Sequence, residues 1–458
     1  MYSEDNYFDS QRNSIDSQRN SIDSDSYFRD EESRLIKSEP EPHPRSKPKI
    51  PKEKNLTNVL HLALTLVLLF SAYNPAQNLL SVYFKQFGLD YLGLFSIMII
   101  CQCSGITSLL APLIVSRLPY KNILTAAAVG ATCLIILGKL VSGCNTDASA
   151  YFCQSYMLHR LTVSASILTG IGMGFIWLTS SVYIQECSYE ANKGSVFGIF
   201  SSVYQFCNIS GSLITLTLVK HVSISSFFTI QIFLSIIAVG LFQTIKKPEV
   251  TKPKKERSIQ REEEPIKIQK IIHFMNREKM KSCYPIFVLY SFSSAFLVSN
   301  LSKMVGNTLQ DYSPTEANLK LGYILLTLSI SQISAGVICG LIFDKSRKNA
   351  LEIIMQLAFA TVVLNYIGYH WGSYYFFFPL AVCYGFLDSG FLTIINALIG
   401  GRFSGKYEQF AVFRFVHGMS QSLFYLLFMI FENSVPSAMF FLFIFVAYYA
   451  WDNRKSLF

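Results

Sequence analysis

The chain has 458 residues, of which 51% are hydrophobic and only 15% are charged, and its formal net charge is +9. Soluble domains carry about 25% charged residues, so this balance predicts a membrane protein and argues against a soluble globular one. The basic excess does not indicate nucleic-acid binding, because it is concentrated in the segments that separate long apolar runs.

The first segment, residues 1–54, is polar and repetitive, with Ser10–Asp16 repeated directly as Ser17–Asp23. Such a segment cannot bury enough apolar surface to fold, so a disordered tail is expected. Within it, Glu31, Leu35 and Ile36 fit an acidic dileucine sorting signal, which a receptor would read as an address. A chance match to this short pattern is the alternative interpretation.

Twelve apolar runs follow, and each approaches the roughly 20 residues that cross a bilayer as a helix. They are continuous, whereas the strands of a membrane barrel alternate, so only helices fit. The runs lie at 57–80, 90–115, 121–141, 161–184, 194–219, 226–245, 283–301, 319–343, 350–370, 374–399, 409–431 and 435–451. We expect two six-helix lobes at 57–245 and 283–451, a linker at 246–282, and a short tail at 452–458.

Lysine and arginine are unevenly distributed between the two ends of these runs. They are dense at 45–54 and 246–281 and recur in the short turns on the same predicted side. The opposite side has only six, namely Lys85, Lys139, Arg160, Lys220, Lys303 and Lys320. Because cytosolic loops carry the basic excess, both termini are predicted to be cytosolic, and the basic residues to contact anionic lipid headgroups.

In the first run, Asn74, Gln77, Asn78 and Ser81 are spaced i, i+3, i+4 and i+7. This spacing predicts one polar stripe along a helix. Pro75 removes a backbone hydrogen bond within the stripe and is expected to kink the helix. The stripe is interpreted as lining a cavity where side-chain amides bind a solute or ion. Hydrogen bonding between helices is the alternative.

The loop between the third and fourth runs contains Cys144 and Cys153. It lies on the predicted non-cytosolic side, where a disulfide forms if the compartment is oxidising. Separate thiols are equally compatible with the sequence, because spacing does not give the distance between the two residues.

Further candidate lining residues occur in the fifth and seventh runs. Tyr204 and Asn208 share a face of the fifth helix, and Tyr290 lies in the seventh. In the linker, Ile268, Ile271, Ile272 and Met275 fall on one helical face. That face predicts either an interfacial helix on the headgroups or a linker helix packed on the protein.

Two tight basic turns occupy matching places in the two halves, at 116–121 and 340–348. The second resembles the Gly-x-x-x-Asp-Arg-x-Gly-Arg loop of the major facilitator superfamily. The resemblance implies two parallel six-helix repeats and a latch in which Asp344 caps or pairs with a neighbouring helix end and Arg347 contributes charge. The first turn has Ser116 in place of the carboxylate.

Two opposite charges lie inside the last apolar runs, Asp388 in the tenth and Arg414 in the eleventh. A carboxylate there costs roughly 2.5–3.5 kcal/mol on insertion scales, so it is expected to face a cavity or a partner. Asp388 is interpreted as a proton-coupling group, a direct cation ligand, or the partner of Arg414 in a structural ion pair. The pair is preferred, because an unpaired intramembrane arginine is hard to hold.

Three segments resemble the Unc-ninety-three-like, ion-channel-regulator-like branch of that superfamily. They are Phe70–Leu79, Gly170–Trp177 with Tyr183, and Gly385–Ser389 with Asn396–Leu398 and Phe410–Phe415. The resemblance extends over the membrane region and leaves out the tail and the linker. It implies channel regulators and escorts of membrane receptors as relatives, and it places Asn396 among the candidate pathway residues.

Two functions are therefore carried forward. The polar stripe and Asp388 favour a secondary transporter of a small solute, proton or cation by alternating access. The resemblance favours a non-transporting regulator or trafficking escort of another membrane protein. No Walker loop, zinc motif or cofactor motif occurs, so neither an enzyme nor a cofactor or metal site is expected. The membrane is predicted to be the plasma membrane or an endolysosomal or vacuolar one.

Overall fold

The computed structural model describes residues 52–452, with gaps at 90, 145–150, 250–267, 310–311, 372, 404 and 431–434. All of these residues belong to one compact unit, Pro51–Phe458. The sorting signal predicted at Glu31, Leu35 and Ile36 lies outside the described residues.

A helix lies at each of the twelve predicted runs. The helices are α2 (Lys52–Gln86), α3 (Leu92–Leu110) continued by α4 (Pro112–Val115), α5 (Tyr120–Gly143), α6 (Ser155–Cys187), α7 (Lys193–His221), α8 (Ile224–Phe242), α11 (Tyr284–Phe296) continued by a π-helical turn (Leu297–Leu301) and α12 (Ser302–Thr308), α13 (Pro314–Lys345), α14 (Arg347–Trp371), α15 (Phe377–Arg402), α16 (Glu408–Ile430) and α17 (Val435–Asp452). Short helices α9 (Ile268–Asn276) and α10 (Glu278–Lys281) precede α11.

Nine helices of the described chain are long and apolar enough to cross a membrane, as judged by length and composition. Among the helices at the twelve runs, α7, α16 and α17 do not meet this criterion in the described residues. Two of them, α7 and α16, carry polar side chains that form the site described below.

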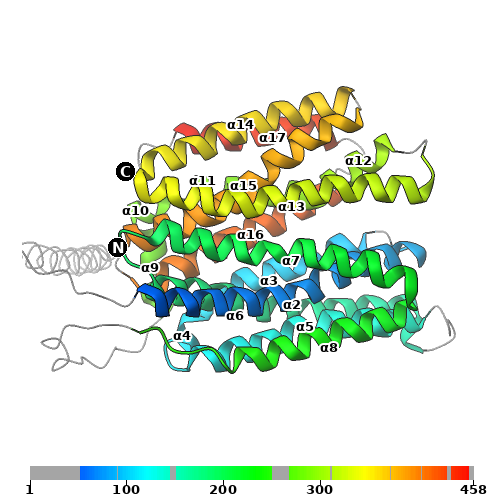
Figure 1. The fold of residues 1–458 in the computed structure, drawn as a ribbon, viewed down its shortest axis with the longest axis horizontal. Coiled ribbons are helices and arrows are strands. Elements are labelled where there is room, and N and C mark those ends of the chain that lie inside the picture. The colour runs from blue at the N-terminus through cyan, green and yellow to red at the C-terminus, as the bar shows by residue number, and fades with distance from the viewer. Residues whose placement is uncertain are drawn as a thin grey trace, which may run out of the picture. The chain divides into compact units, whose positions relative to one another are not determined.

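The helices run back and forth along one direction (Figure 1). The first six gather on one side of the bundle and the last six on the other, as two lobes. The lobes meet where α7 packs on α13 and where α3 packs on α16. We call the end at which α2 begins and α17 ends the terminal end of the bundle. Because the helices alternate in direction, α7 begins and α13 ends there.

Apolar side chains cover both the inside and the outside of the bundle. The core contains fully buried aromatic rings such as Phe227, Phe287 and Phe391. Large apolar side chains are also exposed on the helix surfaces, among them Leu64 on α2 and Ile330 on α13. An exposed apolar surface of this extent is expected of helices whose outer faces contact lipid.

The structure decides one of the alternatives that the sequence leaves open. Cys144 and Cys153 form a disulfide, with their Cα atoms 5.5 Å apart. In the linker helix α9, Ile271 is fully buried and Phe274 packs edge-on against Phe403, whereas Ile268 and Ile272 are exposed, so both predicted roles of this helix stay open.

Candidate functional site

A cluster of amides surrounds the carboxylate of Asp388 between the two lobes. Gln332 on α13 donates a hydrogen bond from Nε2 to Oδ2 of Asp388 at 2.9 Å, and Gln205 on α7 donates to the same oxygen at 3.2 Å. Within the described residues, Asp388 has no other hydrogen-bond partner and no ion pair. Its second oxygen, Oδ1, accepts no hydrogen bond from the described residues.

The cluster continues to the first helix of the chain. Asn208 on α7 donates from Nδ2 to the Oε1 atoms of Gln205 and Gln332, at 2.9 Å each. Asn74 on α2 donates from Nδ2 to Oδ1 of Asn208 at 3.1 Å. We call these residues, together with Asp388, the Asp388 cluster. It joins α2 and α7 of one lobe to α13 and α15 of the other.

Local sequence features bring α2 and α7 close enough for this contact. Pro75 is within α2, and its ring lies against Gly211 of α7, where an added Cβ would come within 3.0 Å of the proline Cγ. Ser71, one turn before Pro75, forms a hydroxyl pair with Ser210. The missing side chain at Gly211 therefore lets α7 approach the proline turn that presents Asn74.

Five other predicted pathway residues lie outside the Asp388 cluster, and Asn396, one of them, is described in the next paragraph. Gln77 and Asn78 make no side-chain hydrogen bond to the described part of the chain, and the side chain of Asn78 is exposed. Tyr204 packs its ring edge-on against Trp177, with the centroids 5.1 Å apart. Tyr290 stacks on the ring of His417 at 4.6 Å. The predicted stripe thus contributes a single residue, Asn74, to the cluster.

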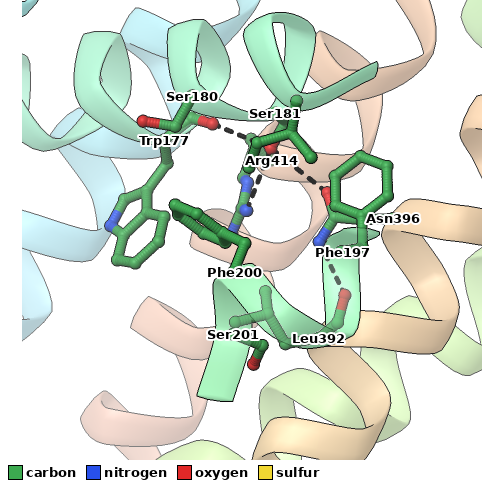
Figure 2. Close-up of a pocket in the computed structure, with 10 residues that line it drawn as sticks. Trp177, Ser180, Ser181, Phe197, Phe200, Ser201, Leu392, Asn396 and Arg414 are labelled. Atoms are coloured by element: carbon green, nitrogen blue, oxygen red, sulfur yellow. Dashed lines mark hydrogen bonds between the residues drawn. The ribbon is translucent and has the colours of Figure 1, made fainter. Parts of the chain in front are cut away.

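The predicted ion pair between Asp388 and Arg414 is absent among the described residues, and this is a correction. Arg414 instead donates from Nη2 to Oγ of Ser181 at 3.3 Å, and Ser181 donates to Oδ1 of Asn396 at 3.2 Å (Figure 2). Asn396 follows Asp388 on α15 by eight residues, which is about 12 Å along a helix. Arg414 thus bonds beside Asn396, and its guanidinium makes no ion pair with Asp388 among the described residues.

At the terminal end, glycines bring the backbones of α7 and α13 into contact. A Cβ added at Gly340 would overlap the carbonyl oxygen of Gly194, and one added at Gly336 would lie 2.8 Å from the carbonyl oxygen of Gly198. Such distances are shorter than real Cβ atoms adopt, so only glycine permits this approach. We call these four glycines the glycine seam. Because α7 and α13 belong to different lobes, the seam closes the lobes at this end.

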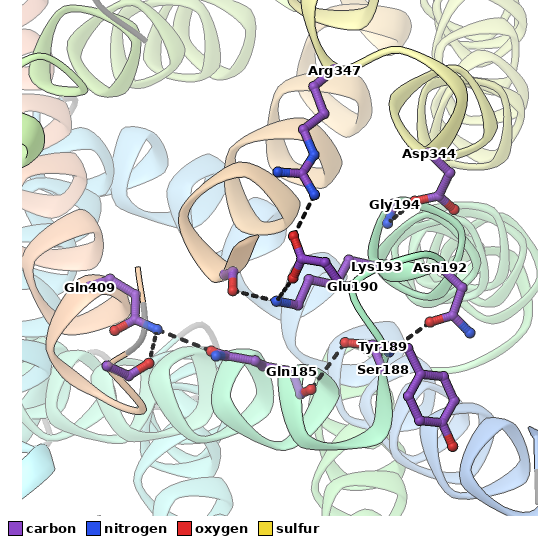
Figure 3. A network of polar contacts seen from close by, with 12 residues as sticks. Gln185, Ser188, Tyr189, Glu190, Asn192, Lys193, Gly194, Asp344, Arg347 and Gln409 are labelled. Atoms are coloured by element: carbon purple, nitrogen blue, oxygen red, sulfur yellow. Dashed lines mark hydrogen bonds and ion pairs between the residues drawn. The ribbon is translucent and has the colours of Figure 1, made fainter. Parts of the chain in front are cut away.

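Asp344 holds the start of α7 beside the seam. Its carboxylate accepts hydrogen bonds from the backbone N–H groups of Gly194 and Ser195, each at 2.7 Å, and from the hydroxyl of Ser195 (Figure 3). The N–H groups in the first turn of a helix lack partners within the helix, and a negative charge there is favourable. Asp344 of one lobe therefore caps a helix of the other, as the loop pattern predicts.

A second group of contacts crosses between the lobes next to Asp344 (Figure 3). Glu190 forms ion pairs with Lys193 at 2.9 Å and with Arg347, and Lys193 also donates to the carbonyl oxygen of Gly400 at 2.5 Å. Partial burial acts to raise the pKa of Glu190, but the hydrogen bonds and charges of Lys193 and Arg347 outweigh it and hold the pKa below its ordinary value. Glu190 is therefore ionised at neutral pH.

Further polar contacts complete the closure of the terminal end. Lys406 pairs with Glu186 at 2.6 Å, and Gln409 donates from Nε2 to Oε1 of Gln185 at 3.1 Å. Lys270 of the linker helix α9 pairs with Glu408 at 3.1 Å. These pairs connect the start of α16 and the loop before it to α6 and to the linker.

Sequence reasoning missed Gln205 and Gln332, the two residues that hold Asp388. Each is an amide inside an apolar run, which is the same signal that singled out Asp388. Both are well buried, with 3% and 4% of their surfaces exposed. A systematic search for amides within the predicted helices would have found them.

Comparison with known proteins identifies what the chain resembles. A family model described as Major Facilitator Superfamily matches residues 148–425. A proton:xylose symporter structure has a TM-score of 0.65 at 12% identity, over 87% of this chain and 95% of that one. No curated protein matches the chain in sequence.

Two further solved structures have a comparable similarity. A bacterial homologue of the iron transporter ferroportin, in an outward-facing state, has a TM-score of 0.62 at 10% identity, over 87% of this chain and 98% of that one. A human organic anion transporter also has a TM-score of 0.62 at 10% identity, over 89% of this chain and 100% of that one. At these identities the likeness shows the fold alone.

Proposed function

The chain belongs to the major facilitator superfamily, and from this premise we propose that it is a secondary transporter. It moves a small polar solute or a cation by alternating access of its two lobes, and Asp388 couples the movement to a proton or binds the cation directly. The observation that carries the proposal is a carboxylate held between the lobes by neutral amides, with no cationic partner among the described residues.

The chemistry of the Asp388 cluster supports this substrate class. A carboxylate inside the membrane is stable when it binds a proton, a cation or a cationic group. Oδ2 of Asp388 accepts both amide hydrogen bonds, so Oδ1 is the atom available to the ligand. The neighbouring amides of Asn208 and Asn74 offer donors and acceptors for the hydroxyl or amino groups of a polar solute.

The contacts at the terminal end support alternating access. The glycine seam, Asp344 and the pairs around Glu190 close the lobes there by short polar contacts and backbone packing, which can separate as a unit. Basic residues concentrate at this end, among them Lys193, Lys270, Arg347 and Lys406. We therefore place the terminal end, and both termini, in the cytosol.

The proposal is tested by flux in liposomes reconstituted with the purified protein. Uptake of labelled sugars, amino acids and small ammonium ions is measured with and without a pH gradient. We expect at least one solute to be taken up in a gradient-dependent way, and Asp388→Asn to lower that uptake at least tenfold. Gln332→Leu should also lower the uptake, because leucine cannot form the hydrogen bonds that Gln332 makes with Asp388 and Asn208.

Ser334→Ala is the matched control on the same helix as Gln332. Its hydroxyl donates only to the backbone of its own helix, at Ile330, so uptake should be unchanged. Failure of the wild-type protein to move any solute, cation or proton would refute the proposal. Stable recovery of a channel or receptor in mild detergent would then favour the regulator or escort function that the Unc-ninety-three-like resemblance implies.

A further inference from the structure

The second charged group between the lobes, Arg414, is buried without a compensating charge. Its surface is 7% exposed, and the described residues place no carboxylate within ion-pair distance of it. A guanidinium has five N–H donors. In the described chain only Nη2 has a hydrogen-bond acceptor, Oγ of Ser181, while Nε is buried with no partner.

Aromatic rings compensate for only part of this charge. The guanidinium carbon lies 5.1 Å from the ring centre of Trp177 and 4.9 Å from that of Phe413. A cation over an aromatic face gains about 2 kcal/mol when desolvated. The effective penalty for burying an ion is several kcal/mol, so the rings do not offset it. The site therefore needs a further partner with negative charge.

A small cavity lies directly beside the guanidinium (Figure 2). Its volume is about 10 Å³, and it is lined from both lobes, by Trp177, Ser180 and Ser201 on one side and by Asn396 and Arg414 on the other. The hydroxyl of Ser180 is buried and has no hydrogen-bond partner in the described part of the protein. Residues with unpartnered polar atoms on both lobes thus line one cavity.

We propose that this cavity is an anion site that takes one small monovalent anion, of the size of a halide, against Arg414. The unpaired Nε–H of Arg414 and the hydroxyl of Ser180 supply its hydrogen bonds, and Trp177 forms one wall. None of the residues that line the cavity belongs to the Asp388 cluster, although Leu392 lies only one turn after Asp388 on α15. The site does not depend on which solute the protein moves.

The size of the cavity selects among anions. The cavity has a volume of only about 10 Å³, so a monatomic anion suits it better than a bulkier carboxylate or phosphate group. A single water would satisfy hydrogen bonds but leave the charge uncompensated. An anion satisfies both, and charge-assisted hydrogen bonds are about twice as strong as neutral ones.

Anion binding would act on the arrangement of the lobes. The lining residues come from α6 and α7 of one lobe and from α15 and α16 of the other, so the site is complete only while the lobes are closed at the terminal end. A ligand that binds one state better than another shifts the population toward that state. A halide is therefore expected to stabilise the closed state.

The experiment uses the fluorescence of Trp177 in the full-length protein. The chain has three tryptophans, and Trp371→Phe with Trp451→Phe leaves only Trp177. Iodide, a collisional quencher, is titrated against sodium gluconate at constant ionic strength. We expect a saturable quenching component that chloride displaces. Arg414→Gln should weaken that component at least about tenfold, because the charge-assisted hydrogen bonds are lost.

Arg160→Gln is the matched control, because Arg160 is an exposed arginine that contacts Tyr156 away from the cavity, and it should leave the saturable component unchanged. If Arg414→Gln does not elute as a single species, Arg414→Lys replaces it and should weaken the component by a smaller factor. Quenching that is linear in iodide for the wild-type protein would overturn the proposal and assign the cavity to water. An unchanged saturable component in the Arg414 variant would also overturn it.

Discussion

The glycine seam makes a prediction whose size follows from the structure. Gly340→Ala places a methyl group 3.0 Å from the carbonyl carbon of Gly194 and 3.2 Å from the Cα of Gly198. Both neighbours are backbone atoms, so α7 and α13 must move apart. Overpacking of this kind costs about 1–3 kcal/mol. If the closed state bears that cost, the open population rises about 5- to 150-fold.

The assay is the rate at which a maleimide labels Ser201→Cys in a background without other free cysteines. Ser201 is 1% exposed and its hydroxyl pairs with that of Ser389 across the lobes at 2.9 Å, so labelling requires opening. Gly322→Ala on the same helix is the control, because no atom lies within 4 Å of its added Cβ. Equal labelling rates in the Gly340 and Gly322 variants would refute the reasoning.

Three further predictions use the same protein. Asp344→Ala should raise the Ser201→Cys labelling rate at least about fivefold, because it leaves two N–H groups of α7 without acceptors. Each unsatisfied group costs the closed state about 1–3 kcal/mol. Ser116→Ala is the control and should not change the rate, because the Ser116 hydroxyl has no described partner. Because the pKa of Glu190 is lowered from 4.5, its pairing stabilises closure at neutral pH and is lost as the pH falls below that value. Labelling of the wild type should therefore approach that of Glu190→Gln in acid, and a constant difference between them would contradict this. Reduction of the Cys144–Cys153 disulfide, which closes a loop of sequence separation 9, should lower the free energy of unfolding by about 2.5 kcal/mol in the chain-entropy picture, as measured by denaturant titration.

The helices were predictable because the membrane imposes a simple rule on the sequence. Apolar runs of sufficient length must be helical, and a helix lies at each of the twelve predicted runs. The family match and the solved structures confirm the all-α major facilitator fold with two six-helix lobes. The capping role of Asp344 followed from the resemblance of residues 340–348 to the superfamily's loop, which implies a cap or a pair at a neighbouring helix end.

The partners of individual polar residues were less predictable. The sequence gives the depth of Asp388 and Arg414 only to within a few residues, and it does not give the rotation of one helix against another. Opposite charges on successive helices therefore suggested a pair, whereas the structure gives each a separate set of hydrogen-bond partners. For the same reason, the sequence did not distinguish Asn74, which joins the Asp388 cluster, from Asn78, which lies on the exposed side of α2.

The Asp388 cluster and the glycine seam lie on the same surface of contact between α7 and α13. Gln332, Gly336 and Gly340 are spaced by four residues on α13, so the amide that holds Asp388 lies on the helix face that forms the glycine seam. On α7, Gly198 and Gln205 are seven residues apart and also share a face. If a ligand takes Asp388 from Gln205 and Gln332, as proposed, α7 and α13 both lose their hydrogen bonds to α15. We therefore expect occupancy of the Asp388 cluster to affect closure of the lobes through the contact between α7 and α13.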